Sequence, residues 1–137
     1  MLWQAFSHIK ESISLFILSF AVRKRNIIEA WHVCRRYYHN RLFLKVDLLY
    51  VFAYLFRNPY NISKRFLKNL GAENVYAYGE TPLTTMDLIA KEASITKDDT
   101  VFELGCGRGL TVFWLHCFIG CRVIGIEWVP KFLQKAI

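Results

Sequence analysis

The spacing of apolar positions in the first half of the chain predicts four helices. The predicted helices cover residues 1–22, 26–39, 42–56 and 62–70. The third helix ends before Asn58-Pro59, because proline disfavours helical backbone in the residue that precedes it. Gly71 suits the left-handed position that closes the fourth helix. The apolar pattern of the first half therefore predicts a helical region.

The second half alternates between helical and strand-like patterns. It predicts a loop over 72–80, a helix over 81–93, a strand over 100–104, a helix over 110–119, a strand over 121–127 and a helix from Pro130. Thr81 is the expected N-cap of its helix, and Pro82 fits the first helical position, where a missing N–H costs nothing. Apolar residues on both faces of the second strand indicate a sheet that is covered on both sides.

The order strand, glycine turn, helix, strand is one right-handed βαβ unit. It predicts an α/β fold with a ligand site at the carboxyl ends of the strands. Two regions follow from the patterns: a basic, apolar helical extension over residues 1–71, and a sheet domain over 72–137.

Charge divides the chain in the same way. Residues 1–70 hold 12 Lys and Arg against 3 Asp and Glu, whereas residues 71–137 have a net charge of −2. Such asymmetry favours contact between the first half and an anionic partner. Three uses stay open: an accessory region packed on the sheet domain, attachment to an anionic membrane surface, and RNA binding through interleaved basic and aromatic residues.

The cysteines and the apolar stretches bear on the compartment. The four cysteines, Cys34, Cys106, Cys117 and Cys121, show no C-x-x-C spacing, so no metal site is predicted and a reducing, cytoplasmic location is expected. The apolar run 13–22 is too short to span a membrane, but its basic flank keeps a membrane-peripheral location open.

Candidate chemistry centres on the sequence VFELGCGRGL, residues 101–110. Gly105, Gly107 and Gly109 permit a sharp turn and a close approach of a ligand to the backbone. Leu110 stands where a dinucleotide fingerprint requires its third glycine, and the Gly-Lys-Ser/Thr of a phosphate loop is absent. Glu103 would repel a pyrophosphate and favours a cation.

A second acid ends the following strand. Glu127 has two acceptor oxygens for the hydroxyls of a ribose, and Trp128 beside it can cover a flat base. Together the residues predict a ligand with a ribose, a base and a positive group. A plain turn without a ligand and a nicotinamide-binding domain are the alternatives.

These residues carry a family resemblance. FELGCGRG followed by VIGIE resembles the cofactor-binding half of class I S-adenosylmethionine-dependent methyltransferases, which implies a partial Rossmann-like β-α-β sheet preceded by a helical N-terminal region. The resemblance implies that the methionine end of the cofactor lies at Glu103, Gly105, Cys106, Gly107 and Gly109, the ribose at Glu127 and the adenine at Trp128. It also implies that Tyr78, Gly79 and Thr81 close over the cofactor.

The resemblance covers about residues 76 to 137 and stops before the segment that orients the methyl acceptor. The sequence thus predicts the N-terminal portion of a methyltransferase, inactive alone, with an unknown acceptor, no assignable catalytic residue and a missing C-terminal half. The alternative is a non-enzymatic membrane-peripheral or interaction protein that keeps a degenerate nucleoside-binding unit.

Overall fold

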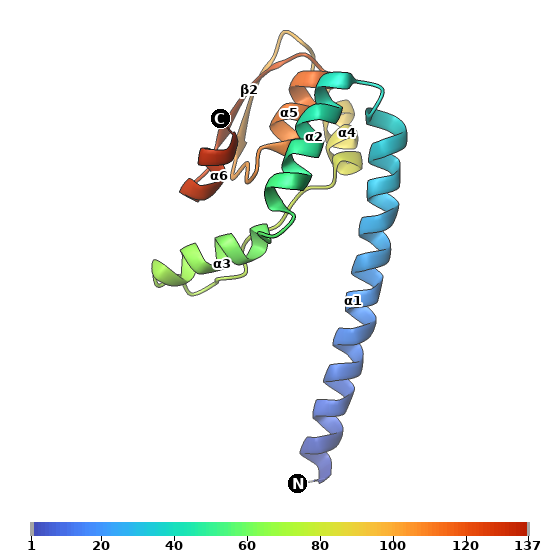
Figure 1. The fold of residues 1–137 in the computed structure, drawn as a ribbon, viewed down its shortest axis with the longest axis vertical. Helices are drawn as coiled ribbons and strands as arrows, with labels where there is room; N and C mark the ends of the chain where they lie inside the picture. The colour runs from blue at the N-terminus through green and yellow to red at the C-terminus, as the bar shows by residue number, and fades with distance from the viewer. Residues whose placement is uncertain (1, 137) are drawn as a thin grey trace.

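The computed structural model describes the backbone of residues 2–136 and the side chains of residues 16–134. It is a mixed α/β structure, mainly helical, with one small parallel sheet (Figure 1). Its elements are α1 (Leu2–Tyr37), α2 (Arg41–Tyr54), α3 (Pro59–Asn69), α4 (Leu83–Glu92), β1 (Thr100–Leu104), α5 (Leu110–Phe118), β2 (Arg122–Ile126) and α6 (Pro130–Ala136).

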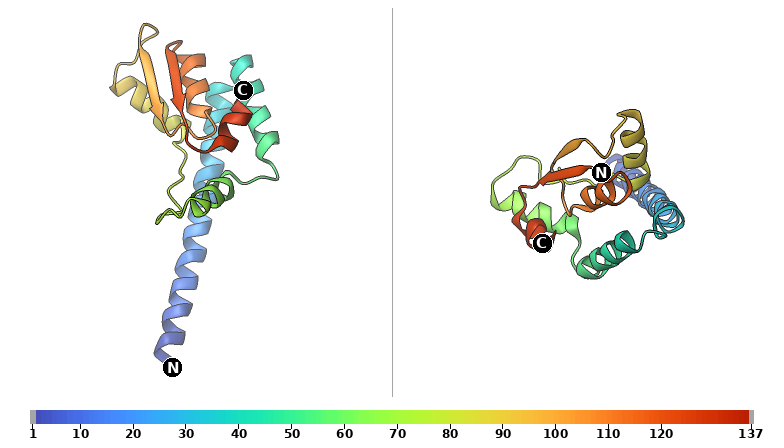
Figure 2. Two further views of the ribbon diagram at one scale, coloured as in Figure 1. Left: turned by 90° about the vertical axis from the view of Figure 1, so that its left-hand side faces the viewer. Right: turned by 90° about the horizontal axis from the view of Figure 1, so that it is seen from above.

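Helix α1 is continuous where the sequence predicted two helices. The predicted break fell at Arg23, Lys24 and Arg25, but these residues are good helix formers and keep their charges in solvent. No glycine or proline occurs between the two predicted helices, so nothing ends the first one. Much of α1 projects from the rest of the molecule (Figures 1 and 2).

Asparagine caps fix the starts of the next two helices. Asn40 accepts hydrogen bonds from the N–H groups of Leu42 and Phe43, and Asn58 accepts one from Tyr60. With Pro59 in its first position, α3 begins three residues before the predicted Ile62. Gly71 has a φ of 70° and follows α3, which confirms the predicted left-handed closure.

The sheet confirms the predicted β-α-β order. Strands β1 and β2 pair in parallel, from Thr100 opposite Arg122 to Leu104 opposite Ile126, with α5 between them in the chain. Val101 and Val123 pack towards the core. The expectation that both faces are covered is wrong for the described residues, because side chains on the other face are exposed: Phe102 to 62 %, Leu104 to 79 % and Ile126 to 50 %.

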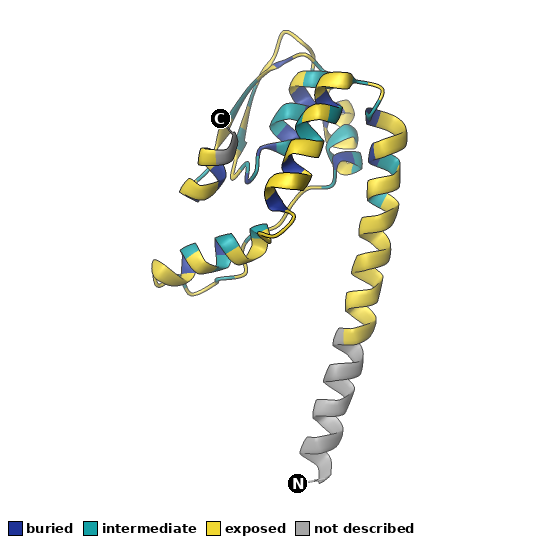
Figure 3. Cartoon of the chain, in the orientation of Figure 1, coloured by how far each residue is buried: buried dark blue, intermediate teal, exposed yellow. Residues whose placement is uncertain are grey.

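The larger core cluster joins the helical region to the βαβ unit. Trp114 and Leu115 of α5 are almost completely buried, together with Val33 and Tyr37 of α1 and Phe43 of α2. The rings of Tyr37 and Trp114 meet edge to face with their centroids 5.6 Å apart. A smaller cluster of Tyr50, Tyr54, Val129 and Phe132 joins α2 to α6. Burial is mapped on the chain in Figure 3.

The start of α4 differs from the prediction. Helix α4 begins at Leu83 with Pro82 at its N-cap, so Thr81 lies outside the helix and does not cap it. The cap comes from α1 instead, because Oε1 of Glu29 accepts the backbone N–H of Thr84 at 3.0 Å and Oε2 accepts the Thr84 hydroxyl at 2.7 Å. A residue 55 positions away thus supplies the acceptor that Thr81 was expected to supply.

Candidate functional site

The glycine turn between β1 and α5 is built on left-handed backbone. Gly105, Gly107 and Gly109 have φ values of 76°, 55° and 82°, which side chains other than glycine rarely adopt. The N–H groups of Gly105 and Cys106 donate to the carbonyl of Ile126 at 2.7 and 3.1 Å, so the turn is anchored on the end of β2. The sharp turn predicted from the three glycines is therefore confirmed by the backbone.

Glu127 holds the turn from the other side. Its Oε2 accepts the N–H of Gly107 at 2.7 Å, and its Oε1 accepts the N–H groups of Trp128 and Val129, each at 2.7 Å. A carboxylate has about four lone-pair sites, so these three bonds leave one on Oε2. Glu127 thus joins the glycine turn to the segment that enters α6.

Glu103 lies at the end of β1 and is only half satisfied. Its Oε1 accepts a short hydrogen bond from the hydroxyl of Thr111 in the first turn of α5. Its Oε2 is buried and has no hydrogen-bond partner among the residues that the structure describes. Burial raises the pKa of the Glu103 carboxyl, although the bond from Thr111 acts in the opposite direction. A donor that carried positive charge would satisfy Oε2 and offset this desolvation.

The segment before α4 crosses the glycine turn. The ring of Tyr78 lies so close to Gly107 that a Cβ there would be 3.3 Å from Cε2 and Oη of Tyr78. The Tyr78 hydroxyl donates to Glu80, and the pKa of Tyr78 is raised, first by burial and then by this carboxylate. The guanidinium of Arg108 makes a two-point ion pair with Glu80, with Nε to Oε1 at 2.7 Å and Nη2 to Oε2 at 2.6 Å.

Arg108 is held on a second side as well. Its Cζ lies 5.0 Å from the centroid of the Tyr54 ring, so α2 packs against the guanidinium that Glu80 binds. Burial alone would lower the pKa of Arg108, but the pairing with Glu80 raises it overall. The segment before α4 is therefore bound to the glycine turn through Tyr78 and Glu80, and the guanidinium of Arg108 that they contact stays charged.

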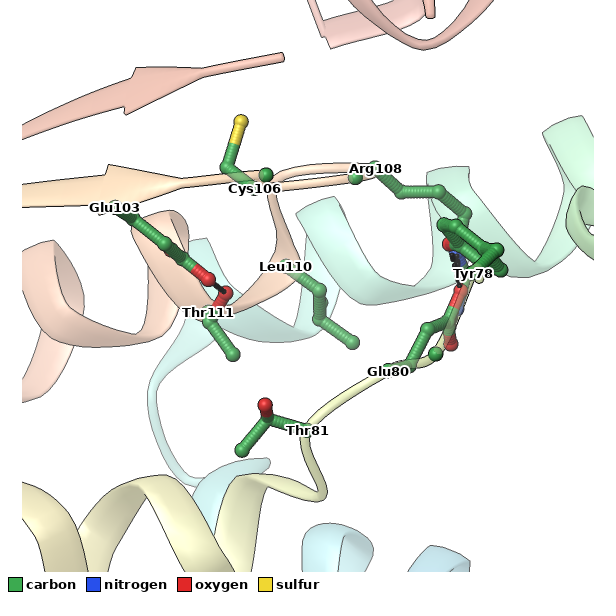
Figure 4. Close-up of a pocket in the computed structure, with 11 residues that line it drawn as sticks. Tyr78, Glu80, Thr81, Glu103, Cys106, Arg108, Leu110 and Thr111 are labelled. Carbon is green, nitrogen blue, oxygen red and sulfur yellow. Dashed lines mark hydrogen bonds and ion pairs between the residues drawn. The ribbon is translucent and has the colours of Figure 1, made fainter. Parts of the chain in front are cut away.

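These contacts enclose a small cavity (Figure 4). Its volume is about 60 Å³, and its lining is Tyr78, Gly79, Glu80, Thr81, Glu103, Gly105, Cys106, Gly107, Arg108, Leu110 and Thr111. Figure 4 shows Tyr78, Glu80 and Arg108 gathered on one side of the cavity and the Glu103–Thr111 pair on the other. Pockets for drug-sized ligands usually measure about 300–1,000 Å³, so a nucleoside needs this segment to move outward.

Most of the residues predicted for a site lie around this cavity, and three do not. Gly109 lies at the N-cap of α5, and Glu127 faces the backbone of the turn. Trp128 is 67 % exposed, and its ring meets the edge of Phe66, with the centroids 5.5 Å apart. The structure therefore brings the two predicted acids to the same turn but leaves Trp128 outside the cavity.

Sequence reasoning missed four lining residues: Glu80, Arg108, Leu110 and Thr111. The sequence did contain a local signal for Thr111. Its hydroxyl lies in the first turn of the helix that follows the strand of Glu103, and from there it can reach the Glu103 carboxylate. The Glu80–Arg108 pair had none, since 28 positions separate the two residues and either charge alone reads as a solvated surface group.

Within residues 16–134, no group of three or more His, Cys, Asp or Glu side chains is placed to hold a metal ion. All four cysteines are free thiols, and burial raises the pKa of Cys117 and of Cys121. In the same part of the chain, no helix has the length and apolar character needed to cross a membrane.

Comparisons with known proteins give no relative. No protein-family model, no curated protein and no solved structure matches the chain.

Proposed function

We propose that the glycine turn binds S-adenosylmethionine and that the chain is the cofactor-binding portion of a methyltransferase. The observation that carries the proposal is the buried, unsatisfied Oε2 of Glu103 at the edge of the cavity. The ammonium of an amino acid donates hydrogen bonds and carries a positive charge. It would therefore give Oε2 the hydrogen-bond partner it lacks and offset the desolvation of the carboxylate.

The turn also fits the methionine end of the cofactor. A Cβ built on Gly105 would meet no atom within 4 Å, so a ligand can lie against this backbone without a side chain in the way. Thr111 orients the Glu103 carboxylate through its hydroxyl, leaving Oε2 for the ligand. The residues present thus fit the ammonium and the adjacent backbone contacts of the cofactor.

The ribose end has a narrower fit. Oε2 of Glu127 retains one lone pair beyond its bond to Gly107, which suffices for one ribose hydroxyl. Trp128 reaches an adenine only if its ring turns away from Phe66. Binding of the whole cofactor therefore requires that the Tyr78–Thr81 segment and Trp128 both move.

The bound cofactor would supply a methyl group on a sulfonium: a nucleophile on the acceptor would attack the methyl carbon, and the S–CH3 bond would break to release a neutral thioether. In such a reaction the protein positions the reactants, and Glu103 and Glu127 are positioning residues for the cofactor. No described residue is assigned to the acceptor. We propose that further β-α units cover the exposed sheet face of Phe102, Leu104 and Ile126 and supply the acceptor site, since parallel sheets are normally covered on both faces.

A second candidate function is a non-enzymatic interaction protein with a degenerate nucleoside-binding unit. The observation that favours it is the engagement of both Glu127 oxygens by backbone N–H groups, which gives this acid a structural role without any ligand. The cavity volume of about 60 Å³ points in the same direction.

Calorimetric titration of the full chain with S-adenosylmethionine and with S-adenosylhomocysteine distinguishes the two candidate functions. The first proposal expects binding of both, weakened about tenfold or more by Glu103→Gln, because a hydrogen bond to a charged group contributes about 1.5–3 kcal/mol. Glu92→Gln, which changes an exposed acid at the end of α4, is the matched control and should bind as the unchanged protein does. No binding at millimolar ligand, or equal binding by Glu103→Gln, would favour the second function.

A further inference from the structure

Helix α1 carries an apolar face that packs against nothing in the described chain. Six large side chains along it are between 46 and 72 % exposed. They are Phe16, Ile17, Phe20, Ile27, Ile28 and Trp31, here called the α1 stripe. At 3.6 residues per turn these positions share one side of the helix, and they extend over about 22 Å.

The α1 stripe faces away from the body of the protein. Val33 and Tyr37 lie on the other side of α1 and are buried in the core with Trp114. Glu29 lies on that other side too, where it binds Thr84 of α4. The orientation of α1 is therefore fixed by its last turns, and the described residues before those turns are exposed (Figure 3).

The surface around the stripe is positively charged. Lys24 lies within the stripe and Arg23 at its border, and Arg35 lies at its end with Cζ 5.3 Å from the centroid of the Trp31 ring. Between residues 16 and 36 the only acid is Glu29, and its carboxylate is occupied by Thr84. Apolar and aromatic side chains beside unneutralised Arg and Lys are typical of helices that lie on anionic membranes.

A second copy of α1 fits the stripe poorly. The basic group formed by Arg23 and Lys24 lies midway between Phe16 and Trp31. Both a parallel pair and an antiparallel pair of stripes would therefore place one basic group against the other, with no acid between them. Like charges in contact destabilise such a pair.

RNA fits less well than lipid. Three of the six stripe residues are isoleucines, which neither stack on bases as rings do nor bind phosphate. In lipid all six contribute, because each removes apolar area from water. The basic side chains can extend along the helix to lipid phosphates while their stems stay in the apolar layer.

We infer that α1 is a membrane-interface helix, with the α1 stripe embedded at the headgroup and acyl boundary of a bilayer that contains anionic lipid. Helix α1 lies in the plane of that surface, Trp31 and Arg35 sit at headgroup level, and Arg23 and Lys24 contact lipid phosphates. This inference goes beyond the proposed cofactor binding and does not depend on it.

Vesicle flotation of the full chain tests the inference, with phosphatidylcholine vesicles compared with vesicles that also contain phosphatidylglycerol. We expect binding to the mixed vesicles, a fall with added salt, and little binding to phosphatidylcholine alone. Phe20→Gln and Lys24→Gln should each weaken binding about fivefold or more. Leu18→Gln is the matched control: Leu18 is 60 % exposed on the same part of α1 but lies off the stripe, and its change should have little effect.

Four outcomes would overturn the inference. The first two are equal binding to both vesicle types and equal losses in Phe20→Gln and Leu18→Gln. The third is self-association of the free chain that Phe20→Gln abolishes. The fourth is RNA binding that Phe20→Gln weakens, together with no binding to either vesicle type. The same thermal unfolding midpoint in all variants establishes that they are folded, as the exposure of the changed side chains leads us to expect.

Discussion

The N–H of Gly107 donates a hydrogen bond of 2.7 Å to Oε2 of Glu127, across 20 residues of chain. This bond links the turn after β1 to the residue after β2, so it fixes the relative position of the two strand ends where parallel sheets bind ligands. Glu127 therefore supports the local fold through three backbone N–H groups, whatever else it binds.

Replacing Glu127 with Gln tests this structural role. The amide keeps one acceptor oxygen but turns an N–H₂ group towards either Gly107 or the Trp128 and Val129 pair. We expect the free energy of unfolding to fall by about 1–3 kcal/mol, because at least one charge-assisted hydrogen bond is lost and a backbone donor is left unsatisfied. Urea denaturation measures the change, and Glu92→Gln should stay within about 0.5 kcal/mol of the unchanged protein. Equal midpoints for both variants would show that the three bonds contribute nothing.

Glu103 makes the stability of the protein depend on pH in a predictable direction. Burial raises the pKa of its carboxyl above the ordinary value of 4.5, so the folded state binds the proton more tightly than the unfolded chain does. The contribution of Glu103 to stability is therefore greatest below the unfolded pKa and is lost as pH rises through the folded pKa.

The variant Glu103→Gln removes this titration. We expect its stability relative to the unchanged protein to improve as pH rises from acid to neutral, and this trend is read from urea midpoints across a pH series. Glu92→Gln, which changes an exposed acid, is the matched control for the pH series. A difference between the Glu103 variant and the unchanged protein that is the same at every pH would contradict the assignment.

The packing of β2 against the turn sets a strict size limit at Gly125. A Cβ at this position would lie 2.7 Å from Sγ of Cys106 and 3.1 Å from Cγ2 of Val112. Gly125→Ala should therefore lower the free energy of unfolding by about 1–3 kcal/mol through overpacking. Adding Cys106→Ala removes Sγ and should recover part of the loss, as a double-mutant cycle would record.

Gly79 supplies the matched control for that experiment. A Cβ at Gly79 meets no atom within 4 Å, and its φ is not in the left-handed region, so Gly79→Ala should be neutral or stabilising by about 0.4–1 kcal/mol. Similar losses from both alanine substitutions would mean that chain flexibility, not the contact with Cys106, determines the effect at Gly125.

Local signals in the sequence predicted much of the fold. Pro59, Gly71 and Pro130 mark helix ends by backbone chemistry that is confirmed at each position. The ends of both strands were predicted to within one residue, because short runs of β-branched residues beside a glycine turn favour strands. The continuous α1 was missed since charged residues look like a connection in sequence but are compatible with a helix.

The arrangement of the site depends on contacts that no local pattern encodes. The two acids were found because they end strands, and parallel strands bring their ends together. The closing of the cavity by Glu80 and Arg108, the exposure of Trp128 and the capping of α4 by Glu29 all follow from how distant helices pack. Such tertiary pairings become predictable only when the packing is known.

Replacing Glu29 tests how firmly α1 is joined to the sheet domain. Its two oxygens accept both the N–H and the hydroxyl of Thr84 in the first turn of α4, where negative charge also interacts favourably with the helix dipole. Glu29→Ala should lower the free energy of unfolding by about 1–2 kcal/mol and speed amide exchange in the first turn of α4. Thr84→Val removes the hydroxyl but keeps the N–H, so it should lose less, and the two changes together should lose less than their sum. Additive losses, with amide exchange in α4 unchanged, would show that Val33 and Tyr37 hold α1 in place without the cap.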